Sequence, residues 1–370
     1  MQIMEELKEQ GIDDSQIIYI NFEDYDYNFI QSGTDLHEYI KKKLVKDKKY
    51  YLFFDEIQIV SNFERVINSF RMKFNTSIFI TGSNGKLLSG ELATFLSGRC
   101  VNFRLQPFSF AEVCEIKGMK ADVVTEKDLV EYLEWGGMPQ RFQMKDEEQM
   151  KTFLRDVYDT IVFRDIVQRG KIKDIELFGR IIDYLVNNPS QTFSVSAITD
   201  YFLSISRRVS KETIYNYLEH ITSSLIMEKA SRYDIRGKRI LTKKDKYYLT
   251  DLGLGRIRNT GFKLEMGALL ENAVYNELIR RGYEVYVGKT RKGEIDFVAV
   301  KENRKEYYQV AYYLTDQSVI DREFGAFASI SDNFPKYVIS MDLGDFSRDG
   351  IIHKNAIRFF LDDSALQSGK

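Results

Sequence analysis

Apolar runs alternate with helical periodicities over the first 120 residues. A strand that is covered on both faces reads as a continuous apolar run, so each such run predicts a buried strand. The expected strands are residues 17–22, 51–54, 77–82 and a short fourth one at 101–105. Helices are expected between them at 34–46 and 62–74, the second with an apolar face. Strands that alternate with helices of this length predict βαβ units and a parallel sheet, which is an α/β fold.

After residue 120 the pattern of apolar and polar positions changes. Residues 121–170 have helical periodicity, and the segment 226–249 is basic and strand-rich. Between them we expect three short helices, at 177–187, 195–203 and 211–223. Three helices followed by a hairpin is the order of a winged helix, a relative of the helix-turn-helix. From Met266 a helix leads into expected strands at 283–287, 295–300 and 307–310, followed by mixed helix and strand.

Composition narrows the class of protein. A chain of 370 residues is long enough for two or three domains. Two cysteines, Cys100 and Cys114, are too few for a disulfide scaffold and fit a reducing cytoplasm. Three scattered histidines argue against a zinc site, and no apolar run approaches membrane-spanning length. The 53 basic and 55 acidic residues nearly cancel, so net charge indicates no partner.

Two carboxylates end the second predicted strand. Asp55 and Glu56 follow the run Tyr-Leu-Phe-Phe, at the carboxyl edge of the sheet where α/β proteins bind ligands. This is the pattern of a Walker B element, in which Asp55 would hold Mg²⁺ through its water shell and Glu56 would polarise the attacking water. The phosphate-binding partner, Gly-x-x-x-x-Gly-Lys-[Ser/Thr], is matched by no segment of the 370 residues. The nearest string, residues 82–87, has the wrong glycine spacing and no hydroxyl after its lysine.

Several short blocks, taken in order, resemble one family: prokaryotic P-loop ATPases of the AAA+-like group (AAA_14) that end in a DUF4143 domain. The blocks are Tyr-Ile-Asn-Phe-Glu-Asp at 19–24, Phe-Asp-Glu-Ile-Gln at 54–58, Ile-Thr-Gly-Ser-Asn at 80–84, Leu-Ser-Gly-Arg at 96–99, Leu-Gln-Pro-Phe-Ser-Phe at 105–110, Trp-Gly-Gly-Met-Pro at 135–139 and Gly-Ala-Leu-Leu-Glu-Asn at 267–272. The resemblance implies an ATPase core over 1–120, a helical lid over 121–170, a winged helix over 171–258 and a DUF4143 domain over 259–370. The expected cofactors are ATP and Mg²⁺.

The resemblance also implies that a Walker A loop precedes the first helix. Residues 1–10 look like the helix that this loop opens, with the loop itself removed. We therefore expect an N-terminally truncated P-loop domain, through an internal start, a disrupted gene or a misassigned start rather than an evolved loss. Without the backbone N–H groups and the lysine that hold the phosphates, binding and hydrolysis of ATP should be impaired.

Three further residues are candidates for this site. Ser83 and Asn84 follow an apolar strand and a Thr-Gly turn, which resembles a sensor-1 position that reads the γ-phosphate. The alternative is ordinary turn chemistry, which favours the same residue types. Arg99 could stabilise transition-state charge as an arginine finger, in its own subunit or in a neighbouring subunit of a homo-oligomer. An arginine on the surface at a strand start explains it nearly as well.

The expected winged helix carries a basic patch. Residues 205–250 contain eleven lysines and arginines against five acids, in a chain that is otherwise nearly neutral. Phosphate contacts dominate DNA affinity, so this patch predicts a duplex footprint. The candidate contacts are Arg207, Arg208, Lys211 and Asn216 near the recognition helix, and Arg236, Lys238 and Arg239 at the wing tip. The alternative is a winged helix that serves only interdomain packing.

The C-terminal region has the residue order of a PD-(D/E)xK nuclease core. Glu271 lies on a helix, Asp296 on a strand and Gln309 on the next strand. Gln309 replaces the expected glutamate, and Ala311 replaces the expected lysine. Loss of a carboxylate ligand and of the general-base lysine should leave little metal affinity and no obvious base, as in a degenerate nuclease. A restriction-endonuclease-like α/β domain that recognises a partner or a nucleic-acid end is the expectation.

Overall fold

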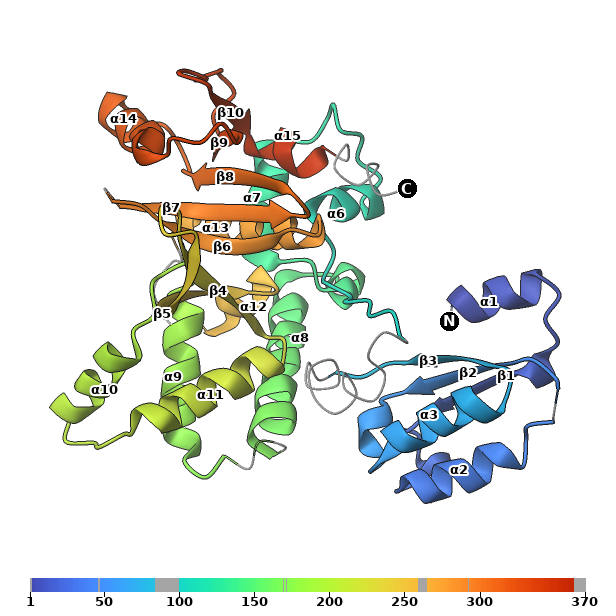
Figure 1. The fold of residues 1–370 in the computed structure, drawn as a ribbon. Coiled ribbons are helices and arrows are strands. Elements are labelled where there is room, and N and C mark those ends of the chain that lie inside the picture. The colour runs from blue at the N-terminus through green and yellow to red at the C-terminus, as the bar shows by residue number, and fades with distance from the viewer. Residues whose placement is uncertain are drawn as a thin grey trace. The chain divides into compact units, whose positions relative to one another are not determined.

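The computed structural model describes residues 2–45, 47–83, 100–168, 170, 172–258, 265–291 and 293–362. The chain forms two compact units, Met1–Arg104 and Leu105–Lys370 (Figure 1). Each unit has its own core and is described separately below.

The first unit is built on a parallel sheet of three strands, in the order β1-β2-β3. These are β1 (Ile17–Asn21), β2 (Tyr50–Asp55) and β3 (Thr76–Ile80), and they confirm three of the predicted strands and their parallel pairing. Helices α2 (Gly33–Lys41) and α3 (Phe63–Lys73) contribute Leu36, Ile40, Phe63 and Phe70 to the same core as Leu52 and Phe54. The predicted first helix is also present, as α1 (Gln2–Glu9).

The predicted strand at 101–105 is wrong. These residues form no regular element, and Val101, Phe103 and Leu105 are 77%, 82% and 93% exposed. A strand requires partners for its N–H and C=O groups, and no described strand pairs with this segment. The apolar alternation of the segment was therefore not sufficient to define its structure.

The second unit begins with helices, and all but the first of them lie in the region 121–170 that the sequence predicted to be helical. They are α6 (Phe110–Ile116), α7 (Glu126–Trp135), α8 (Glu147–Asp159) and a π-helical continuation, η5 (Thr160–Gln168). The three short helices follow as α9 (Ile175–Asn187), α10 (Val195–Ser204) and α11 (Lys211–Ser223), each close to its predicted bounds. Buried residues of α8 to α11 form one core, which includes Leu154, Phe178, Phe202 and Ile221.

A hairpin follows α11 and joins a larger sheet. Strands β4 (Met227–Asp234) and β5 (Arg239–Leu249) pair antiparallel. The sheet has seven strands in the order β10-β9-β8-β7-β6-β4-β5. Its other strands are β6 (Glu284–Lys289), β7 (Glu294–Lys301), β8 (Arg304–Val310), β9 (Lys336–Ser340) and β10 (Ile351–Asn355). Because residues 232–234 pair with residues 287–289 of β6, the hairpin is an integral part of this sheet.

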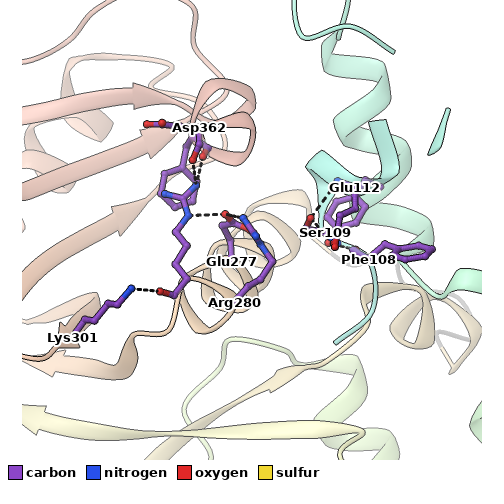
Figure 2. Close-up of polar contacts among 10 residues, drawn as sticks. Phe108, Ser109, Glu112, Glu277, Arg280, Lys301 and Asp362 are labelled. Carbon is purple, nitrogen blue, oxygen red and sulfur yellow. Dashed lines mark hydrogen bonds and ion pairs between the residues drawn. The ribbon is translucent and has the colours of Figure 1, made fainter. Parts of the chain in front are cut away.

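Helices complete the second unit. They are α12 (Leu252–Arg258), α13 (Met266–Arg280), α14 (Gln317–Gly325) and α15 (Ala356–Leu361). The C-terminal end of α13 is fixed by Arg281, which donates to Glu277 at 2.6 Å and to the carbonyl oxygens of Phe359 and Asp362 (Figure 2). Among the described residues, no helix is long and apolar enough to cross a membrane.

The Trp-Gly-Gly-Met-Pro block is a packing site around Asp251. The Asp251 carboxylate accepts hydrogen bonds from the N–H groups of Gly137 at 2.7 Å and Gly253 at 2.9 Å. A Cβ on Gly137 would lie 2.0 Å from the carbonyl oxygen of Phe108, so only glycine fits there. The sequence block therefore stabilises the fold at this point.

Burial raises the pKa of Asp251 to about 6, despite its hydrogen bonds and the nearby Arg141. The folded state thus favours the protonated acid: its contribution to stability is full below about pH 4 and is lost as the pH rises through about 6. The free energy of unfolding of the wild type, minus that of Asp251→Asn, should fall by about 2–3 kcal/mol between pH 4 and pH 7. Urea titrations across this range measure the difference. A difference that is constant or rises with pH would contradict the assignment.

Candidate functional site

The candidate site lies at the carboxyl edge of the three-stranded sheet. Parallel pairing of β1 with β2 sets Asn21 opposite Asp55, and Thr81 follows the last residue of β3. The Asp55 carboxylate accepts hydrogen bonds from Tyr19 Oη at 3.1 Å and from the Thr81 hydroxyl. The carboxyl ends of β2 and β3 therefore lie close together, as expected for neighbouring strands of a parallel sheet.

Glu56 turns away from the strand in a left-handed conformation, with φ +55° and ψ +42°. A non-glycine residue in this region costs about 1–2 kcal/mol and is often found at functional sites. The turn allows the Glu56 carboxylate to accept hydrogen bonds from Ser83 Oγ at 3.2 Å and from the Gln58 amide. Gln58 also donates to Ser83 at 3.3 Å. Of the predicted nucleotide residues, the structure thus brings Glu56 and Ser83 together, with Asp55 as the neighbour of Glu56.

Two predicted residues of this site, Asn84 and Arg99, lie outside the described residues. Three others were missed in the sequence: Tyr19, Gln58 and Thr81 hold the two carboxylates in place. The position of Thr81 at the end of a predicted strand gave a signal for its role. The position of Tyr19 gave none, because its contact depends on the pairing register.

The oxygen atoms of Asp55 and Thr81 suit a magnesium site that the protein shares with water and a phosphate ligand. Mg²⁺ prefers oxygen ligands and is usually held by one or two protein groups together with water and phosphate oxygens. Asp55 and Thr81 can supply such groups, because a carboxylate has about four lone-pair directions and two are used by Tyr19 and Thr81. Among the described residues, no cluster of three or more His, Cys, Asp or Glu is placed to hold a metal ion by itself. The donor set therefore fits a magnesium ion that arrives with a phosphate ligand.

The three residues of the nuclease-like pattern also converge, in the second unit. Asp296 accepts a hydrogen bond from the Val310 N–H at 2.8 Å, and its own N–H donates to Gln309 Oε1 at 3.3 Å. Glu271 accepts from Tyr248 Oη at 2.8 Å. Burial raises the pKa of Asp296 well above its usual range, and neighbouring Glu271 raises it further. Glu271, Asp296 and Gln309, which form a pattern in the sequence, therefore also lie close together in the structure.

A lysine that the sequence did not indicate enters this cluster. Lys246 of β5 lies 3.1 Å from Glu271 Oε1 and 2.7 Å from Glu294 Oε1, and Arg232 pairs with Glu294 at 3.0 Å. Burial alone would lower the pKa of Lys246, but Glu271, Asp296 and Glu294 together raise it above its usual value. Ala311 still stands where the nuclease pattern has its lysine, and Lys246 is a different lysine that comes from another strand. Lys246 comes from the hairpin and acts as a buried counter-ion.

The predicted nucleic-acid residues fall in three places. Arg207 pairs with Asp174 at 2.7 Å and with Glu176 at 3.3 Å, so it links the loop before α11 to α9. Arg208, Lys211 and Asn216 are exposed around the N-terminal half of α11. The wing-tip residues Arg236, Lys238 and Arg239 are also exposed, but on the turn between β4 and β5 that joins the larger sheet.

A cavity elsewhere in the second unit is too small to be an active site. Its volume is about 20 Å³, which is room for one water molecule. Its polar lining includes Asp251, Asn276, Glu277 and Arg280. Glu277 and Arg280 satisfy each other through two hydrogen bonds of 2.6 and 2.7 Å (Figure 2). No substrate site follows from it.

Comparison with known proteins places these features in a family. Residues 1–114 match the profile of the AAA domain AAA_14, residues 126–261 a domain of unknown function, DUF8612, and residues 266–359 the domain of unknown function DUF4143. An uncharacterised protein of Haemophilus influenzae is 37% identical over 342 residues, which cover 92% of this chain and 84% of that protein. One of Methanocaldococcus jannaschii is 33% identical over 326 residues, covering 84% and 71% respectively.

Similarity to solved structures is weak. A Walker-type ATPase of Pyrococcus abyssi aligns with 66% of this chain and 84% of its own, at a TM-score of 0.41 and 14% identity. A TM-score of this size supports no conclusion about function.

Proposed function

Because the chain belongs to the family of AAA_14 proteins with a C-terminal DUF4143 domain, we propose that its first unit is an ATP-dependent module whose catalytic carboxylates are Asp55 and Glu56. The observation that supports this most is their position at the carboxyl edge of the parallel sheet, beside Ser83 and Thr81 of the next strand end. When bound, Mg²⁺ would neutralise phosphate charge.

Each residue has a distinct part in this proposal. Asp55, oriented by Tyr19 and Thr81, would accept hydrogen bonds from water molecules around the ion. Glu56 would orient the attacking water and accept its proton, since the left-handed turn directs its carboxylate toward Ser83. Ser83, together with Asn84, would report on the γ-phosphate, and Arg99 would supply positive charge.

We propose further that this chain of 370 residues binds ATP weakly. Phosphate binding in P-loop proteins depends on consecutive backbone N–H groups and a lysine, and no segment here has the required spacing. Carboxylates alone repel phosphate. The sequence thus supplies carboxylates for magnesium and water but no segment with the P-loop spacing for the nucleotide phosphates.

The role of Asp55 is tested in a chain that carries a strand and a Gly-x-x-x-x-Gly-Lys-Ser loop in front of α1. Asp55→Asn should reduce the gain in ATP affinity that Mg²⁺ provides by about tenfold or more, because the amide supports the ion's water shell less well. Calorimetry with and without Mg²⁺ measures this gain. Asp26→Asn, at an exposed acid near β1, is the control and should change nothing. An Asp55→Asn variant with an unchanged magnesium dependence would contradict the assignment.

A second candidate function is DNA binding without catalysis. It is favoured by the exposed positions of Arg208, Lys211 and Asn216 around the first half of α11, whose N-terminus is capped by Ser210. In a helix-turn-helix protein this part of the second helix contacts the bases. Replacement of Arg208 and Lys211 by serine should weaken a salt-dependent shift of duplex DNA. The absence of any shift at low salt would count against this function.

A further inference from the structure

Two hairpin turns lie side by side at one end of the seven-stranded sheet. Strands β4 and β6 are parallel neighbours, with Asp234 opposite Lys289 at their ends. The Ile235 N–H donates to the carbonyl oxygen of Lys289 at 3.2 Å, which joins the β4–β5 turn to the β6–β7 turn. Neighbouring strands are about 5 Å apart, so the two turns form one continuous edge.

Gly288 is what allows this close approach. A Cβ on Gly288 would lie 2.9 Å from Ile295 Cβ and 3.1 Å from Ile235 Cδ1. Since a real side chain cannot approach its neighbours so closely, glycine lets Ile235 pack directly onto β6. The juxtaposition of the two turns is thus built into the sequence.

The edge carries a cluster of exposed cations, which we call the double-turn edge. Its members are Arg236, Lys238, Arg239, Lys289 and Arg291, all exposed. Among the described residues, no ion pair within 4.0 Å involves any of these five side chains. The one acid within the first turn, Asp234, accepts a hydrogen bond from the Gly237 N–H at 3.0 Å, and this bond and the nearby charges of Arg239 and Lys289 lower the pKa of Asp234. The edge therefore has a positive excess that its own acid does not cancel.

The first acid after the second turn is neutralised by cations on the inner side of the sheet. Glu294, directly after the β6–β7 turn, is bound by Arg232 at 3.0 Å and Lys246 at 2.7 Å. It is therefore unavailable to the cations of the edge. The sequence indicated three of these five residues, because Lys289 and Arg291 are about fifty residues away from the wing in the chain.

We propose that the double-turn edge binds the phosphate backbone of a DNA duplex. This extends the second candidate function by naming a surface other than α11. Single-strand binders add exposed aromatic side chains on which bases stack. Here the aromatic residues of the adjoining strands β4 and β6, Tyr233 and Tyr286, are half-buried and contact each other at 5.8 Å between ring centroids. Cations without a stacking platform favour the regular phosphates of a duplex, read without sequence preference.

The test uses the full chain and a labelled duplex of about 25 base pairs, in fluorescence anisotropy over a series of salt concentrations. If five phosphates are neutralised, the logarithm of the association constant should fall with log salt at a slope of about −4.5. Lys289→Ser with Arg291→Ser should make the slope shallower by about 2 and weaken binding at least tenfold at low salt. Arg236→Ser with Lys238→Ser should act similarly.

Three comparisons make the result decisive. Lys41→Ser with Lys42→Ser, at exposed positions in the first unit, should leave the slope unchanged. Lys289→Arg with Arg291→Lys keeps the charges and should keep binding, which separates charge from folding. The proposal is overturned if the double-turn variants match the Lys41/Lys42 variant, if only Arg208 and Lys211 substitutions reduce binding, or if anionic vesicles bind and DNA does not. In the second of these outcomes DNA binding through α11 still stands.

Discussion

Replacement of Lys246 by methionine should lower the free energy of unfolding by about 3–5 kcal/mol, because it leaves buried acids without their cation. Lys246 is 6% exposed and lies within 3.1 Å of both Glu271 and Glu294. Methionine has a similar length but no charge, so the packing volume is nearly kept. What is lost is the ammonium group that joins β5 to α13 and β7. Urea unfolding monitored by circular dichroism gives the value.

The control is Lys229→Met on the neighbouring strand. Lys229 lies 3.9 Å from Asp245, and its side chain is 49% exposed. A pair at this distance with a half-exposed lysine is worth at most about 1 kcal/mol. The loss in Lys246→Met should also shrink as the pH falls, since burial raises the pKa of both Glu271 and Asp296 and protonation removes their charge. Equal losses in the two variants would mean that Lys246 does not stabilise the cluster.

In a chain that carries a phosphate-binding loop, Glu56→Gln should reduce kcat for ATP hydrolysis by about 10²–10⁴-fold, with little change in ATP affinity. The amide keeps the size of the side chain but cannot accept the proton of the attacking water. Single-turnover hydrolysis measured alongside ATP binding separates the two effects. Glu38→Gln, at an exposed position of α2, should hydrolyse like the parent chain. If Glu56→Gln hydrolyses at the parent rate, another group activates the water.

The sequence predicted those parts of the fold that depend on local pattern. The three strands of the first unit, helices α9 to α11 and the hairpin after them all follow from apolar periodicity. Residues 101–105 have an apolar residue at every second position but form no strand, since pairing with another strand is not encoded in such a pattern. The joining of the hairpin to β6 was equally invisible, because it depends on contacts between residues more than fifty positions apart.

The same distinction, between local sequence pattern and contacts made only in the tertiary fold, applies to the candidate sites. Asp55 and Glu56 could be found because a strand and its end are adjacent in sequence. Lys246 could not be found, because it reaches Glu271 and Glu294 only through the tertiary fold. Arg207 was a plausible phosphate contact by charge alone, but its pairing with Asp174 depends on how α9 packs against α11.

We propose above all that Asp55 and Glu56 are the carboxylates of an ATP site in the first unit, and that this 370-residue sequence, which contains no Gly-x-x-x-x-Gly-Lys-[Ser/Thr] segment, binds ATP weakly. The most direct measurement is a calorimetric titration with Mg-ATP of two chains in parallel: the 370-residue chain, and the same chain with a strand and a Gly-x-x-x-x-Gly-Lys-Ser loop in front of α1. The first should bind more weakly than about 1 mM and the second in the micromolar range, a gain of about 4 kcal/mol. Micromolar binding by the 370-residue chain itself would contradict the claim.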